Sequence, residues 1–245
     1  MRQRLIAGNW KMHGNKAMIT HLCEAMREAP LPGVQVALLA PFVFLPLLES
    51  TLRGSTLAYG GQDVSEYQQG AYTGETSAAM LKEYGCRYVI VGHSERRALY
   101  GDTSSRVAKK LIAASAAGLC PILCVGETLA QRQAGQTEAV VSSQLNAVFE
   151  VAPEFANAVI AYEPVWAIGT GQTATPAQAE AVHAFIRGLL SAQYGAVVSE
   201  RTQILYGGSV KADNAAALFA EKNIDGGLVG GASLIAEDFI RICKS

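Results

Sequence analysis

Residues 203–231, QILYGGSVKADNAAALFAEKNIDGGLVGG, decide the fold of this chain. Two short apolar runs, one ending near Gly207 and the other near Gly230, each stop at a pair of glycines. The segment between them can form a helix. A strand, a helix and a second strand in this order predict two parallel strands joined by a helical crossover.

The same unit recurs along the whole sequence. Apolar runs typical of strands end near Asn9, Ala40, Gln62, His93, Val125, Glu163, Gly207 and Gly230. Segments with helical period lie between them, with shared faces formed by Val107, Leu111, Ile112 and Ser115 and by Val182, Phe185, Ile186, Leu189 and Leu190. Eight such units, whose strands are apolar enough to be covered on both faces, predict an α/β fold. We expect one (β/α)8 barrel that forms a single domain over residues 1–245.

A doubly wound open sheet is the alternative for alternating strands and helices. Such a sheet often carries a glycine-rich dinucleotide turn after its first strand, whereas the first run here continues into NWKM. The absence of that turn and the count of eight units both favour closure of the sheet into a barrel.

Composition excludes several classes of protein. Of the 245 residues, 50% are hydrophobic and 17% are charged, and the formal net charge is −1, which argues against a nucleic-acid partner and against disorder. The five cysteines include no CxxC pair and the four histidines no HExxH spacing, so we expect reduced thiols, no metal and a cytoplasmic location. The start, MRQRLIAGNWK, has too short an apolar stretch for a signal peptide, and no run is long enough to span a membrane.

Chemically capable residues gather at the carboxyl ends of the predicted strands. They are Asn9, Lys11, His93, Glu95, Glu163, Ser209 and the pair Gly230 and Gly231. The turns at the opposite ends read PLPGVQ, EYGCR and AAGLC, which are plain helix stops. Because active sites of such barrels lie on the carboxyl-terminal face, these residues predict one active site there.

A long loop follows Glu163. Thr175 reads as the N-cap of the next helix, with Pro176 at its first position and Gln178 closing a capping box, so the loop spans residues 164–175. Twelve residues is roughly twice the usual upper length for such a connection, which favours a functional loop. We expect a lid that closes over a ligand, and its residues include Pro164, Val165, Trp166, Ala167, Ile168, Gly169, Thr170 and Gly171. The alternative is a surface glutamate beside an insertion.

The glycine pairs after the seventh and eighth strands predict a phosphate site. Their turns, YGGSVKADN and LVGGASL, can expose main-chain N–H groups, because glycine lets the backbone approach phosphate oxygens. The pairs Gly60–Gly61 and Gly226–Gly227 are assigned to packing or turns instead.

Lys11 and His93 are candidates for stabilising negative charge. Lys11 can face a phosphate or a developing oxyanion, although by residue type alone a solvated lysine is the commoner case. A helix starting directly after His93 would lower the pKa of the imidazole and leave it neutral, able to donate to a carbonyl; a structural histidine is the alternative. For Glu95, pairing with Lys11 is preferred over a part in proton handling.

Five motifs follow one another along the chain: GNWKM, VGHSERR, YEPVWAIGTG, YGGSV and LVGGASL. With them the sequence closely resembles the triosephosphate isomerase family over essentially all 245 residues. The resemblance implies a TIM barrel that interconverts dihydroxyacetone phosphate and D-glyceraldehyde 3-phosphate without a cofactor or a metal.

The resemblance also implies roles for the residues at the strand ends. Glu163 would be the general base, His93 the neutral electrophile, Lys11 the electrostatic clamp and Asn9 a further contact for the oxyanion. Cys124 resembles a buried cysteine near the catalytic glutamate. The phosphate would lie against the main-chain N–H groups of Gly169, Ser209, Gly230 and Gly231.

The family forms dimers, in which a loop like GAYTGE (residues 70–75) enters the partner near its active site. The interface residues that this implies are the tip residue Thr73, Gly74, Glu75 and Arg96, with Arg96 and Glu75 resembling a supporting ion pair. His13, Tyr72 and Gln172 depart from the residues common in the family and put only interface detail in doubt.

Two other functions are compatible with a phosphate-binding barrel. A Schiff-base aldolase would need a lysine within the barrel, and no predicted strand carries one. A catalytically silent phosphometabolite-binding or scaffold protein would not need Glu163, His93 and Lys11 together. In the isomerase interpretation, Ile168 on the lid and Leu228 beneath it are expected to desolvate Glu163 and make it more basic.

Overall fold

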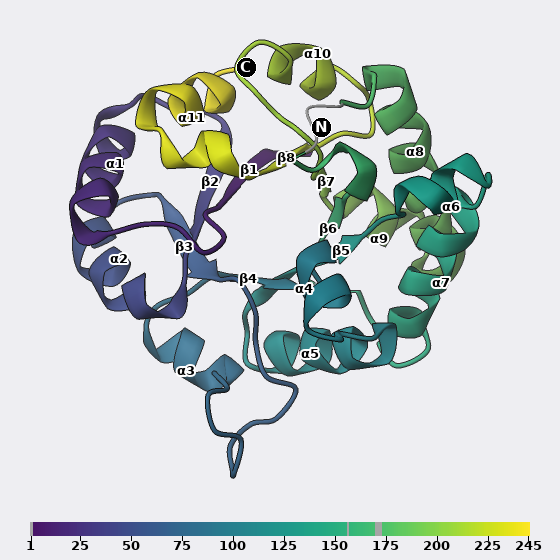
Figure 1. Cartoon of the computed structure of the whole chain (residues 1–245), viewed down its shortest axis with the longest axis horizontal. Helices are drawn as coiled ribbons and strands as arrows, with labels where there is room; N and C mark the ends of the chain where they lie inside the picture. The colour runs from purple at the N-terminus through teal and green to yellow at the C-terminus, as the bar shows by residue number, and fades with distance from the viewer. Residues whose placement is uncertain (1, 156, 170–172) are drawn as a thin grey trace.

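Eight parallel strands close into a barrel in the computed structural model, which describes residues 2–155, 157–169 and 173–245. The strands follow chain order around the barrel, and β8 returns to pair with β1 (Figure 1). Their bounds are β1 (Arg4–Asn9), β2 (Val34–Leu39), β3 (Ala58–Gly61), β4 (Tyr88–Val91), β5 (Cys120–Val125), β6 (Val159–Tyr162), β7 (Ile204–Tyr206) and β8 (Gly226–Val229). The predicted (β/α)8 barrel is therefore confirmed, and the open sheet is excluded.

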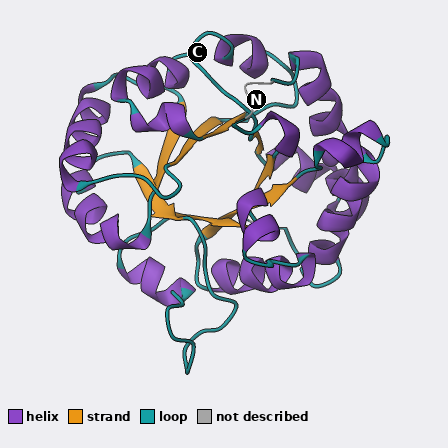
Figure 2. Cartoon of the chain, in the orientation of Figure 1, coloured by secondary structure: helices purple, strands orange, loops and turns teal. Residues whose placement is uncertain are grey.

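Helices form an outer ring around the strands (Figure 2). In the described residues they are α1 (Lys16–Glu28), α2 (Leu45–Leu52), α3 (Ala78–Glu83), α4 (Ser94–Leu99), α5 (Ser104–Ala116), α6 (Leu129–Gln133), α7 (Thr137–Phe149), α8 (Pro176–Tyr194), α9 (Ala196–Arg201), α10 (Ala215–Phe219) and α11 (Ala236–Cys243). Three short 3₁₀ helices, η1 (Phe42–Phe44), η2 (Val165–Ala167) and η3 (Gly231–Leu234), lie in connections at the carboxyl ends of strands.

The strands are buried on both faces. Along β1, Leu5 and Ala7 belong to a cluster of strand residues inside the barrel, whereas Ile6 packs in the larger cluster beneath the helices. Successive side chains of a strand point to opposite faces, so both faces of β1 need apolar residues. This double burial explains why the strands appear in the sequence as continuous apolar runs.

One predicted helix face is wrong in part. Val107 and Leu111 of α5 are buried as expected, but Ile112 is 36% exposed. The buried face instead continues through Ala114 and through Lys110, which is only 3% exposed. Hydrophobicity alone misses this face, because one of its members is a lysine whose charge is neutralised by acidic residues of other segments.

Local capping agrees with the sequence. The side chain of Thr175 accepts from the backbone N–H of Gln178, and the side chain of Gln178 accepts from the backbone N–H of Thr175, so α8 begins with the predicted capping box. Pro176 occupies the first turn, where its missing N–H costs no helical hydrogen bond. The loop predicted for residues 164–175 therefore ends where expected, at the N-cap of α8, and its action as a lid stays a prediction.

A loop of residues 62–77 extends away from the barrel between β3 and α3 (Figure 1, foot of the view).

All five cysteines are buried and none forms a disulfide. Within the described part of the chain, no helix has the length and apolar character needed to cross a bilayer.

Candidate active site

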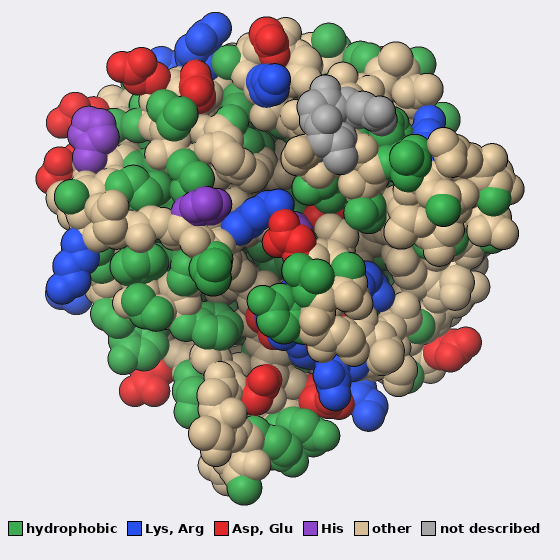
Figure 3. Space-filling view, in the orientation of Figure 1, with side chains coloured by type: hydrophobic (Ala, Val, Ile, Leu, Met, Phe, Trp, Pro, Cys, Tyr) green, Lys and Arg blue, Asp and Glu red, His purple; other side chains and the backbone are tan. Residues whose placement is uncertain are grey.

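A pocket of about 310 Å³ opens at the carboxyl ends of the strands. It brings together most of the residues predicted to form the site, namely Asn9, Lys11, His93, Glu163, Gly169, Ser209, Gly230 and Gly231. These residues come from the ends of β1, β4, β6, β7 and β8 and the connections after them. Figure 3 shows acidic and basic side chains side by side over the centre of this face.

Other predicted residues lie outside this pocket. Glu95 and Arg96 line a neighbouring cavity that shares Lys11 and His93 with it. The predicted interface residues Thr73, Gly74 and Glu75 lie in the extended loop 62–77, away from the pocket. The lid residues Thr170 and Gly171, and the departure at Gln172, fall outside the described residues.

Lys11 is held by its backbone and by a neighbouring acid. Its φ of 52° places it in the left-handed region, which non-glycine residues rarely adopt and which is common at functional sites. Its N–H donates to Asn9 Oδ1 at 3.0 Å, and Gln62 Nε2 donates to its carbonyl at 2.9 Å. Lys11 Nζ donates to Glu95 Oε1 at 2.5 Å, which is the expected pairing. These contacts fix the ammonium group at the pocket edge.

Glu163 is buried and fully engaged. The side chain is 2% exposed, and its Oε1 lies 2.9 Å from His93 Nε2. Its Oε2 accepts from the N–H of Ser94 at 2.9 Å, and the Ser94 hydroxyl lies 3.4 Å from Oε1. Ser94 is the first residue of α4, whose free N–H groups and positive dipole end suit an anion. The carboxylate is thus held by His93 and Ser94, where the chain passes from β4 to α4.

His93 is oriented by the helix that follows it. Its Nδ1 accepts from the backbone N–H of Glu95 at 3.2 Å, so this nitrogen carries no proton in the arrangement seen. The proton of a neutral ring then lies on Nε2 and points at the Glu163 carboxylate.

The pKa values of this pair differ from the sequence-based expectation. Burial lowers the pKa of His93, but the carboxylate of Glu163 and then that of Glu95 outweigh it, so the net shift is upward. Burial raises the pKa of Glu163, but the charge and hydrogen bond of His93 and the N–H of Ser94 outweigh it, so the net shift is downward. The predicted lowering of the His93 pKa and the predicted basicity of Glu163 are therefore absent while the two side chains are in contact.

Small residues make room for the carboxylate. A β-carbon at Gly207 would lie 2.9 Å from Glu163 Cγ and 3.1 Å from the carbonyl oxygen of Tyr162. Cys124 packs against Glu163 from β5; burial raises the pKa of this thiol well above its usual value, and the Glu163 charge adds to the shift. Cys124 is thus an uncharged neighbour, as the resemblance implied.

The first half of the predicted lid, residues 164–169, is tied to a buried acid that sequence reasoning missed. Glu127, which is 0% exposed, accepts from Trp166 Nε1 at 2.9 Å and from the Tyr162 hydroxyl at 3.1 Å. Its carbonyl accepts from the N–H of Val165 at 3.1 Å. The guanidinium of Arg132 lies 4.3 Å from the centre of the Trp166 ring. Glu127 therefore anchors η2 at the start of the predicted lid, and its position just after β5 was the signal available in the sequence.

The base of loop 62–77 carries a second ionic network. Lys110 Nζ donates to Asp63 at 2.8 Å and to Asp102 at 2.9 Å. Arg96 pairs with the same two carboxylates at 2.9 and 3.0 Å. Within the described residues of one chain Arg96 is engaged by Asp63 and Asp102, and the pairing with Glu75 that the resemblance implied at a dimer interface stays a prediction. The network connects the loop to α4 and α5.

Lys211 is a further pocket residue that sequence reasoning did not single out. It lines the pocket beside Ser209, and its N–H donates to Asn214 Oδ1 at 2.8 Å within the turn after β7. Asn214 Nδ2 also donates to the carbonyl of Ser209 at 3.0 Å, which stiffens this turn.

No cluster of three or more His, Cys, Asp or Glu side chains in the described part of the chain is placed to hold a metal ion.

Comparison with known proteins agrees with this geometry. A sequence model of one family, described as triosephosphate isomerase, matches residues 4–245. The chain belongs to the triosephosphate isomerase family. Triosephosphate isomerase of Thiobacillus denitrificans is 58% identical over 247 residues, which cover 100% of this chain and 99% of that protein. The triosephosphate isomerases of Dechloromonas aromatica and Xanthomonas campestris pv. campestris are 54% and 53% identical, each over 100% of this chain and 99% and 98% of their own lengths.

Proposed function

We propose that this member of the triosephosphate isomerase family interconverts dihydroxyacetone phosphate and D-glyceraldehyde 3-phosphate through an enediolate. The observation that carries the proposal is the buried carboxylate of Glu163 in one pocket with the Lys11 ammonium and the His93 imidazole. Residues 1–245 would act as one catalytic barrel domain. The reaction moves one proton between adjacent carbons and one proton between the two oxygens they carry, and needs no cofactor.

The base would be Glu163. It would take a proton from the carbon beside the substrate carbonyl and return it to the neighbouring carbon, so one carboxylate placed over both carbons suffices. Its present partners, His93 and Ser94, occupy both carboxylate oxygens. Glu163 would therefore leave these contacts when substrate binds. It would then lose the two contacts that stabilise its negative charge, and its exclusion from water would raise its pKa.

The same movement would prepare His93. The Glu163 carboxylate and that of Glu95 raise the pKa of the imidazole, whereas burial and the Lys11 charge lower it. Once Glu163 turns away, its contribution is lost, and the neutral ring is favoured. Its Nε2–H would then be free to donate to the substrate carbonyl oxygen, because the N–H of Glu95 holds Nδ1 as an acceptor. Glu95 would act by positioning Lys11 and His93 rather than by handling protons.

Charge on the enediolate would be stabilised from the opposite side. General acid–base catalysis supplies roughly 10²- to 10⁴-fold, below the roughly 10⁶-fold lower limit for typical enzymes, so electrostatics must contribute several kcal/mol. Lys11 and Asn9 lie at the end of β1 and line the pocket, where they could meet the developing oxyanion. The N–H groups of the turns at Ser209 and at Gly230–Gly231 would hold the phosphate.

The lid would exclude water from the intermediate. Ile168 and Gly169 line the pocket together with Leu228. Residues 164–169 are anchored at their start by Glu127, so closure would move the later residues of the predicted lid toward the phosphate. A closed lid would also desolvate Glu163 and protect an enediolate that can lose phosphate.

The oligomer and the location are further proposals from the family resemblance. The protein would form a homodimer in which Thr73 of one subunit, with Gly74 and Glu75, approaches the partner's active site, and it would act in the cytoplasm. Two exposed apolar side chains support an interface at loop 62–77 and the nearby end of β1. Met12 is 93% exposed and Tyr72 is 41% exposed.

The test is a coupled assay that follows glyceraldehyde 3-phosphate formation. Replacing the base by Glu163→Gln should lower kcat by about 10²- to 10⁴-fold, and Glu163→Asp should also be slow because the carboxylate is withdrawn by about one bond. Glu138→Gln, at an exposed position of α7, is the matched control and should retain the wild-type rate. A Glu163→Gln variant with wild-type turnover would refute the assignment. A folded wild-type protein that binds phosphate without turnover would instead be a silent binding protein.

A further inference from the structure

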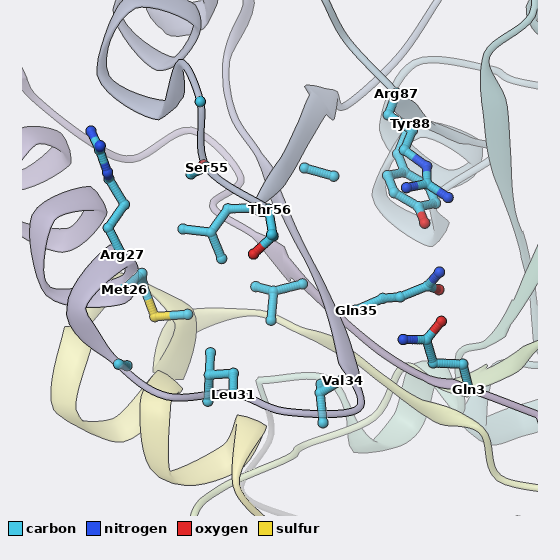
Figure 4. A pocket seen from close by; sticks show the side chains of 15 residues that line it. Gln3, Met26, Arg27, Leu31, Val34, Gln35, Ser55, Thr56, Arg87 and Tyr88 are labelled. Atoms are coloured by element: carbon cyan, nitrogen blue, oxygen red, sulfur yellow. The ribbon is translucent and has the colours of Figure 1, made fainter.

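A second pocket lies at the opposite end of the barrel, between the amino-terminal ends of β1 to β4. It has a volume of about 480 Å³ and is bounded by the turns from α1 to β2 and from α2 to β3 (Figure 4). Sites for small molecules typically have about 300 to 1,000 Å³, so a ligand of moderate size fits. We propose that this pocket binds a small amphiphilic organic anion, with its acid group at Arg87 and an apolar body between the two turns.

One end of the pocket is polar and cationic. Figure 4 shows Arg87, Gln35 and Gln3 grouped at this end, with Tyr88 beside them. The guanidinium of Arg87 lies 5.3 Å from the centre of the Tyr88 ring, which fixes its place. Within the described residues Arg87 has no carboxylate partner. A guanidinium with free N–H groups in a fork suits a carboxylate or phosphate group.

The amide groups at this end are also oriented. Gln203 Nε2 donates to Gln35 Oε1 at 3.1 Å and to the carbonyl of Gln3 at 2.6 Å. The oxygen of Gln35 thereby accepts one hydrogen bond, and its NH₂ group donates none within the described residues and is available to a ligand. This group is a donor, so it reinforces the preference of Arg87 for an anion.

The other end carries apolar side chains beside Arg27 (Figure 4). Met26 and Leu31 lie there in Figure 4, with Val34 at the foot of the pocket. Met26 is buried in the core under the helices, and Leu31 and Val34 pack against that core. A hydrocarbon or aromatic body placed here would remove further apolar surface from water, worth roughly 25 cal/mol per Å².

A buried hydroxyl is left without a partner in the wall. Ser55 Oγ is shielded from water and makes no hydrogen bond within the described residues. Ser55 lines the pocket beside Thr56, and rotation of its side chain about χ1 would bring the hydroxyl to an acceptor atom of the ligand.

The charge of the lining selects the class of ligand. Among the described residues that line the pocket there are two arginines, Arg27 and Arg87, and no aspartate or glutamate. Arg27 donates to the carbonyl of Thr51 at 2.7 Å. No carboxylate of the described residues forms an ion pair with it. A cationic amphiphile would meet only repulsion, whereas an anion meets complementary potential.

This site does not depend on the proposed isomerase function. The pocket lies at the start of the strands and the active site at their ends, separated by the length of β1, roughly 17 Å for its six residues. Among the described residues, neither pocket shares a lining residue with the other. Replacing Arg87 should therefore leave turnover unchanged.

The test uses 4-phenylbutyrate as the anionic probe and 4-phenylbutyramide as its neutral counterpart, in calorimetric titrations of the full chain. We expect saturable binding of the acid with a Kd below about 1 mM and a binding-dependent rise in Tm. The Arg87→Gln variant should weaken binding about tenfold, the loss expected for one charge-assisted hydrogen bond. The affinity of wild type for the neutral amide should be no higher than the affinity of Arg87→Gln for the acid.

Arg201→Gln is the matched control. Arg201 is an exposed arginine at the end of α9, near the start of β7, and it does not line this pocket. This variant should bind the acid as wild type does. No saturable binding to wild type, equal affinity for acid and amide, or equal affinity of wild type and Arg87→Gln would each overturn the proposal.

Discussion

Gly207 offers a direct test of how tightly Glu163 is placed. A β-carbon there would lie 2.9 Å from Glu163 Cγ and 3.1 Å from the carbonyl oxygen of Tyr162. That carbonyl belongs to β6 and accepts from the N–H of Gly207 at 2.7 Å, so it cannot move without breaking the barrel ladder. The Glu163 side chain must therefore yield, by about half an ångström to restore ordinary contact.

The expected result of Gly207→Ala follows from that displacement. A misplacement of about 1 Å can cost 10²-fold, so half of it should lower kcat/KM roughly tenfold. Overpacking should also lower the free energy of unfolding by about 1 to 3 kcal/mol. The coupled isomerase assay measures the first effect, and urea denaturation measures the second.

Gly188→Ala is the control for this experiment. Gly188 is an exposed residue within α8, and a β-carbon there meets no atom within 4 Å. This substitution should leave kcat/KM unchanged and stabilise the helix by up to about 1 kcal/mol. If Gly207→Ala retained kcat/KM within twofold of wild type, the close packing of Glu163 would not govern catalysis.

Three further outcomes are expected. Trp166→Phe removes a donor from the buried carboxylate of Glu127, and it should cost about 1 to 3 kcal/mol of stability and change kcat; an unchanged Tm would show that this anchor is dispensable. Below its raised pKa in the free enzyme, His93 is protonated and activity is lost, so the acid limb of kcat/KM should lie above pH 6.5; the limb of kcat should lie lower, because Glu163 has left the ring in the complex. Imidazole NMR titrations with and without an unreactive phosphate analogue check this, and identical pKa values in both states would contradict it. Burial lowers the pKa of His183 to about 3, so between pH 6.5 and 3 the unfolded chain binds a proton that the folded chain does not. Stability should therefore fall with decreasing pH in this window, by up to about 1.4 kcal/mol per unit from this group, and less steeply in His183→Gln.

The barrel could be predicted because its signals are local. Each strand of the barrel must be apolar on both faces, and its run of apolar residues ends within one or two residues of the observed strand end, as at Asn9 and Val125. The face of α5 was less predictable. Lys110 is buried there only because Asp63 and Asp102, from two other segments, neutralise it. Asp102 lies 8 residues before Lys110, but Asp63 lies 47 residues away, outside any window of neighbouring residues.

The site was predictable to the extent that strand ends converge. Glu163, His93 and Lys11 each follow a strand, so barrel closure alone brings them into one pocket. Glu127 and its bond to Trp166 join positions 39 residues apart, and the sequence does not state which acid faces the lid. The direction of the His93 pKa shift depends on whether the Glu163 side chain contacts the ring. Tertiary packing decides that rotamer, and the local sequence pattern does not.

The left-handed backbone at Lys11 has a consequence for how this position can change. A β-carbon is crowded at a φ of 52°, and glycine alone adopts such a conformation without penalty. Lys11→Gly should therefore unfold at a higher temperature than Lys11→Ala, although both lack the ammonium group. Selection for folding alone would favour a residue without a side chain here, and only a demand for turnover would keep a lysine at this bend.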